Sequence, residues 1–149
     1  GNVVAMTKVS LNELQVLDVA AYLVRPVDFR WAPGIDFSDL WWNPAEPGWG
    51  VSVTQRPNSA VAGTLFIYQA NGEPLWLVFA DMRWLDPLTV SGQLFRSRAR
   101  NFDPSFDPSS VMTRAAGTLR LQFTNRDSGI AEFTIDGVGY RKPISRVAF

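Results

Sequence analysis

The fold is decided by residues 116–146, AGTLRLQFTNRDSGIAEFTIDGVGYRKPISR. Apolar and polar side chains alternate strictly through its first two segments, which indicates strands with one buried face and one wet face. The Asp136–Gly137 pair between its second and third segments is a strong signal for a tight hairpin turn. We therefore predict consecutive antiparallel strands here. The buried face comprises Leu119, Leu121, Phe123, Ala131, Phe133 and Ile135.

The same strand-like pattern extends back to residue 38, with turn residues between the segments. A second hairpin signal, Asn71–Gly72, lies in this stretch. Eight short strands joined mainly by tight turns predict an antiparallel up-and-down barrel, because an open meander would leave two unpaired edges. A two-sheet β-sandwich is the alternative. The candidate strands are 38–42, 49–55, 62–69, 74–80, 88–96, 116–124, 129–136 and 139–146.

The hairpin from Thr64 to Phe79 is apolar on both faces, so its outer face needs a cover. One possible cover is a helix over residues 10–24, SLNELQVLDVAAYLV, which begins with a Ser10–Glu13 capping box. A second copy of the chain, forming a homodimer, is the other. We divide the chain into an N-terminal helical segment (1–25), a linker (26–36) and a β-barrel domain (37–149).

Composition excludes much enzyme chemistry. The 149 residues contain no cysteine and no histidine, which removes thiolate and imidazole nucleophiles, bases and metal ligands. The 14 basic and 14 acidic residues give zero net charge, so nucleic acid is not an expected partner. No apolar run reaches the roughly 18–20 residues of a membrane span. We expect no metal and no cofactor in this chain, and a binding or structural role.

Two segments resemble known families. Met6 followed by the helix ending in DVAAYL resembles the C-terminal end of a c-type cytochrome domain. The resemblance implies that Met6 is a haem axial ligand in a longer parent protein, of which this chain, beginning at Gly1, is a fragment. The alternative is an ordinary capped amphipathic helix, with Met6 as a loop or core residue. Without the CxxCH attachment motif, the chain itself is not expected to hold haem.

Residues 39–149 resemble a family of uncharacterised bacterial domains. The similarity is carried by DLWWNPAEPGWGVSV (39–53), NGEPLWLV (71–78), VSGQLF (90–95), FDPSSV (106–111), GTLRLQF (117–123) and DGVGYRKPISR (136–146). It implies a periplasmic or secreted module and no activity. The WWN opening and the meander also resemble avidin-like and lipocalin-like barrels in layout, which transfers no function.

All six tryptophans lie between positions 31 and 84. Clustered indoles suit stacking on a sugar ring or enclosing an apolar ligand, whereas the alternative is that they fill the barrel and cover its outer hairpin. Glu46, held between Pro44 and Pro47, either accepts hydrogen bonds from a ligand or satisfies groups of its own loop. The candidate ligand-binding residues are Trp42, Asn43, Glu46, Trp49, Tyr68, Trp76 and Arg83.

The remaining charged groups have simpler interpretations. Asp103 and Asp107, each before a proline, are predicted to form Asx turns in a long loop rather than a Ca²⁺ site. The RSRAR run at 96–100 is predicted to form a solvated edge or local ion pairs. Glu46 and Asp81 are the one carboxyl pair worth testing for glycosidase-like hydrolysis.

Three functions follow. The leading one is a non-catalytic, extracytoplasmic barrel that binds a small apolar or carbohydrate ligand, or a protein partner. The second is an accessory domain of a cytochrome electron-transfer protein. The third is a carboxylate-based hydrolase.

Overall fold

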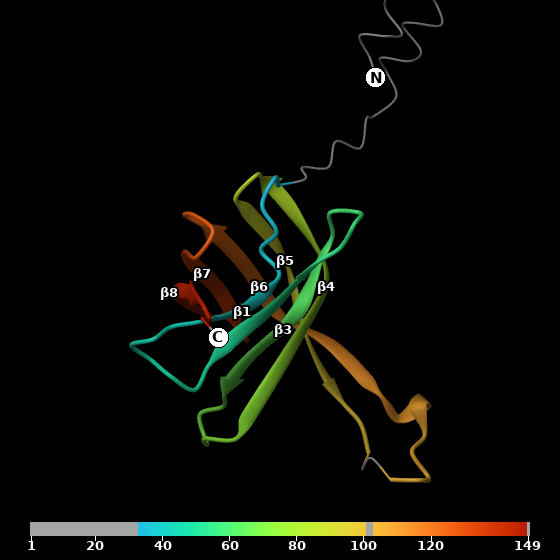
Figure 1. Cartoon of the computed structure of the whole chain (residues 1–149). Coiled ribbons are helices and arrows are strands. Elements are labelled where there is room, and N and C mark those ends of the chain that lie inside the picture. Colours follow the sequence, from blue (N-terminus) through green and yellow to red (C-terminus); the bar gives the residue numbers. More distant parts are fainter. Residues whose placement is uncertain (1–32, 101–102, 149) are drawn as a thin grey trace, which may run out of the picture.

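The computed structural model describes residues 33–100 and 103–148, which form an eight-stranded antiparallel β-barrel (Figure 1). Each strand pairs with its neighbours in sequence, and the last strand pairs with the first, so the sheet closes. The prediction of a barrel rather than a sandwich is confirmed. The elements are β1 (Asp39–Trp42), β2 (Gly50–Gln55), β3 (Val61–Tyr68), β4 (Pro74–Asp86), β5 (Thr89–Arg98), the 3₁₀ turn η1 (Pro108–Ser110), β6 (Met112–Phe123), β7 (Ser128–Ile135) and β8 (Val138–Arg146).

The predicted turn chemistry sets the pairing. Asp136 and Gly137 both have positive φ, 47° and 87°, so the two residues alone connect β7 to β8. Directly opposed residues in an antiparallel pair share a face of the sheet. Counting from this turn therefore places Phe133 opposite Tyr140, and Ala131 opposite Lys142, on the inner face of the barrel.

One end of the barrel is closed by aromatic rings. Phe37, just before β1, stacks on Phe123 with ring centroids 4.0 Å apart and planes 7° from parallel. Trp41 and Trp84 pack around this pair, and the Trp41 indole donates to the Phe37 carbonyl at 3.0 Å. All four residues are buried, so this end is filled by side chains.

Two strands are longer than the sequence predicts. β4 continues to Asp86 rather than ending near residue 80, and β6 begins at Met112 rather than at residue 116. Register shifts interrupt β4 and β5 near Val78/Arg83 and Leu94/Phe95, and such bulges break the simple alternation. The β5–β6 hairpin consequently reaches beyond the barrel wall at the lower right of Figure 1.

The outer face of the β3–β4 hairpin is apolar and exposed, as expected from the sequence. Trp76 is 67% exposed and meets the edge of Phe66 at 5.9 Å, while Tyr68 and Val78 are also exposed. The predicted helix over residues 10–24 lies outside the described residues, so its role as a cover stays a prediction. Among the residues described, no helix is long and apolar enough to cross a membrane.

The seam between β1 and β8 is short. The two strands share only two register positions, Trp41 with Arg146 and Trp42 with Ser145. The Arg146 guanidinium, 16% exposed, donates to Asp39 at 2.8 Å and lies 4.9 Å from the centre of the Trp41 ring. It also donates to the backbone carbonyls of Asp36, Ser38 and Arg126. One side chain thus connects the start of β1, the end of β8 and the β6–β7 turn.

We predict that Arg146→Met lowers the free energy of unfolding by about 3 kcal/mol, because it leaves Asp39 and several carbonyls unpaired. Urea denaturation followed by tryptophan fluorescence measures this. The matched control is Arg141→Met on the same strand, whose exposed guanidinium pairs with Glu132, and which we expect to cost less than about 1 kcal/mol. Equal losses from the two variants would contradict the role given to Arg146.

Candidate functional site

The candidate site lies at the end of the barrel opposite the aromatic plug, called here the open end. The β1–β2 loop, the β3–β4 turn, the β5–β6 connection and the β7–β8 turn all lie at this end. A cavity of about 210 Å³ opens there. It is lined by Glu46, Trp49, Ile67, Tyr68, Phe133, Tyr140 and Lys142.

Three rings form the inner wall of this cavity. Phe133 and Tyr140 are stacked at 5.0 Å across the β7–β8 pair, because the tight turn places them directly opposite each other. Trp49 meets Phe133 at 6.0 Å with an interplanar angle of 52°. Trp49 and Ile67 also pack against the buried core, which holds this wall in place. The wall therefore presents ring surface to an incoming flat group.

Glu46 and Lys142 form the polar side of the cavity. Asn43 is buried and turns the loop, since its side-chain oxygen accepts from the Ala45 amide and its carbonyl from the Glu46 amide, both at 3.0 Å. This turn brings the Glu46 carboxylate to Lys142 Nζ on β8, at 2.7 Å. Glu46 thus pairs across 96 positions of the chain, and it also interacts with Trp49 and Asn43 of its own loop.

The ion pair has a defined charge state. The hydrogen bond from Lys142 lowers the pKa of the Glu46 carboxyl below its ordinary value, and its positive charge, with the side chains of Trp49 and Asn43, lowers it further. Glu46 is consequently an acceptor at neutral pH, beside an ammonium that has three donors. The pair can donate to and accept from one ligand hydroxyl or amide.

The predicted site residues separate into two sets. Glu46, Trp49 and Tyr68 line the cavity, and Asn43 holds the Glu46 loop. The other three lie outside it: Trp76 and Arg83 are exposed, and Trp42 lies in a second, apolar cavity of about 500 Å³ with Leu40, Phe66 and Val147. Trp49 borders both cavities.

Sequence reasoning missed four lining residues: Ile67, Phe133, Tyr140 and Lys142. The signal for Phe133, Tyr140 and Lys142 was present, because a two-residue turn at 136–137 fixes which residues face each other. Ile67 lies in the predicted apolar hairpin, whose pattern indicates no site. Their meeting with Glu46 depends on barrel closure, which no local pattern specifies.

The other candidate residues that the structure describes do not line this cavity. Asp81 pairs at 3.5 Å with Arg83 on an exposed surface, and Glu46 lines the cavity without it. Asp103 and Asp107 accept from the amides and hydroxyls of Ser105 and Ser109, which confirms the predicted Asx turns. Met6 lies outside the described residues. Within residues 33–100 and 103–148, no group of three or more acidic side chains could hold a metal ion.

Comparisons with protein-family models, with curated proteins and with solved structures find no match to the chain. The geometry of the open end is therefore the main guide to function.

We predict that Lys142→Met raises the pKa of Glu46 towards its ordinary value of 4.5. A pKa lowered on folding means that the pair stabilises the fold above the unfolded value, and that this contribution is lost as pH falls through the folded pKa. Carboxyl ¹³C NMR across pH 2–7 measures the shift. Arg141→Met, which removes the neighbouring outward-facing cation, is expected to leave the Glu46 pKa unchanged; an equal shift there would contradict the direct pairing.

Proposed function

We propose that the protein is a non-catalytic binding module that takes a small ring compound bearing hydroxyl groups at its open end. The observation that carries the proposal is the cavity with Trp49, Phe133 and Tyr140 on one side and the Glu46–Lys142 pair on another. Flat rings stack on aromatic faces, and a hydroxyl can donate to Glu46 while accepting from Lys142.

The cavity size favours one ring. Its volume of about 210 Å³ is below the roughly 300–1,000 Å³ typical of sites for drug-sized ligands. A single sugar unit or a phenol meets both requirements, apolar faces and hydroxyl edges. A longer ligand would extend from this cavity past Tyr68, which is exposed at its edge.

The setting of this binding is also part of the proposal. We also propose that the module works in the periplasm or outside the cell, as the resemblance of the residue 39–149 motifs to an extracytoplasmic bacterial family implies. Within such a setting, a non-catalytic barrel would contribute recognition to a larger assembly.

Two probes test the ligand class, methyl β-D-glucopyranoside and 4-methylphenol, each titrated into the ¹⁵N-labelled full chain. We expect at least one to shift the Trp49 indole resonance in a saturable way. Trp49→Ala should then weaken binding of that probe about tenfold or more, because it removes a stacking surface.

The matched control is Trp76→Ala, which removes an exposed tryptophan from the outer face. It should leave the affinity unchanged. Lys142→Met, which keeps the ring wall, should weaken binding by removing the donor to the hydroxyl. If neither probe shifts Trp49, or if Trp76→Ala weakens binding as much as Trp49→Ala, the proposal is wrong.

A further inference from the structure

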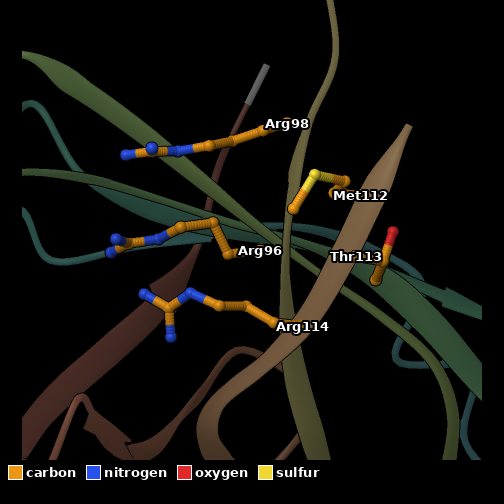
Figure 2. A pocket seen from close by; sticks show the side chains of 5 residues that line it. All are labelled: Arg96, Arg98, Met112, Thr113 and Arg114. Carbon is orange, nitrogen blue, oxygen red and sulfur yellow. The ribbon is translucent and has the colours of Figure 1, made fainter. Parts of the chain in front are cut away.

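Three arginines share one face of the β5–β6 hairpin where it leaves the barrel. Arg96 and Arg114 are direct register partners, and Arg98 lies two residues beyond Arg96, opposite Met112. Figure 2 shows the three side chains extending in the same direction from the two strands. With Met112 and Thr113 they line a cavity of about 270 Å³.

This arrangement works against pairing of the two strands. Like charges placed directly opposite each other across a strand pair are destabilising. Asp136, on the β7–β8 turn, partly offsets the repulsion by pairing with Arg114 at 3.0 Å and Arg96 at 3.3 Å. Arg98 has no ion-pair partner in the part of the chain that the structure describes. Two of the three arginines therefore share one carboxylate.

The hydrogen bonding of Arg96 is also incomplete. Its side chain is only 14% exposed, and its Nε is buried without a hydrogen-bond partner among the described residues. A largely buried guanidinium needs acceptors for its donors, because water no longer supplies them. Arg96 and Arg98 also line a neighbouring cavity of about 310 Å³ that includes Trp76 and Gln69, so the two guanidiniums lie between two open spaces.

We propose that Arg96, Arg98 and Arg114 form a binding site for a tetrahedral oxyanion, either free phosphate or the phosphoryl group of a small molecule. Guanidinium groups are suited to it, because each planar fork donates two parallel hydrogen bonds to a pair of phosphate oxygens. The site shares no residue with the cavity lined by Trp49, so it stands independently of the binding function proposed above.

A small anion fits the cluster better than a nucleic acid. The chain has no net charge, and a single compact cluster offers little to a long phosphate backbone. Asp136 competes for the same donors, so an incoming anion must share or replace its contacts with Arg96 and Arg114.

The test is isothermal titration calorimetry of the full chain with inorganic phosphate and with phenyl phosphate, at low and at physiological salt. We expect saturable binding of one anion per chain. Tighter binding of phenyl phosphate would identify a phosphoryl ligand, and equal binding would identify free phosphate. Arg98→Gln should weaken binding about fivefold or more, since Arg98 has no ion pair within residues 33–100 and 103–148 to lose.

Two further variants distinguish a specific anion site from non-specific electrostatic attraction. Arg100→Gln removes an exposed arginine of the same hairpin that does not line the cavity, and should leave the affinity unchanged. Asp136→Asn keeps a residue that tolerates positive φ but removes the competing charge, and should tighten binding about threefold or more.

Several results would overturn the proposal. These are the absence of saturable phosphate binding at low salt, equal losses from Arg98→Gln and Arg100→Gln, or weaker binding after Asp136→Asn in a folded chain. Tight binding of a decathymidine oligonucleotide without measurable phosphate binding would also overturn it, in favour of nucleic acid.

Discussion

Barrel closure depends on the contacts of Arg146. β1 has four residues and meets β8 at only two register positions, so main-chain hydrogen bonds alone give a weak seam. Arg146 adds an ion pair to Asp39, three bonds to carbonyls and a contact with the Trp41 ring. Without closure, β1 and β8 would be exposed edges, and the meander would lack the enclosed interior that buries its apolar face.

The same seam determines where a ligand can bind. Trp41, held between Arg146 and Phe37, belongs to the ring cluster that fills one end of the barrel. Once past the packed core, inward-facing positions are free to carry polar groups, and Lys142 and Arg96 occupy such positions. Both proposed sites therefore lie at the open end.

The strands could be predicted from the sequence because apolar and polar residues alternate along a half-buried strand. The site was harder to predict, because the same alternation places consecutive residues on opposite faces of the sheet. Trp41 and Trp42 are adjacent in the chain, yet one is buried in the plug and the other lines an outer cavity. Trp49 borders both cavities, whereas Trp76 lies exposed on the outer face. Tryptophans that cluster in sequence thus occupy several different surfaces within the described residues.

Register explains what could and could not be foreseen. The two-residue turn at 136–137 allows Phe133 to be matched with Tyr140 by counting, because no residue is left unassigned between the strands. The β5–β6 connection spans residues 99–111, and a bulge lies at Leu94/Phe95, so no count from sequence matches Arg96 with Arg114. The RSRAR run was expected to form local ion pairs or a solvated edge. Arg98 and Arg100 are exposed, whereas Arg96 pairs with Asp136 of a different hairpin. A cluster of charged residues on two strands joined by a long connection can therefore be recognised only in the folded barrel.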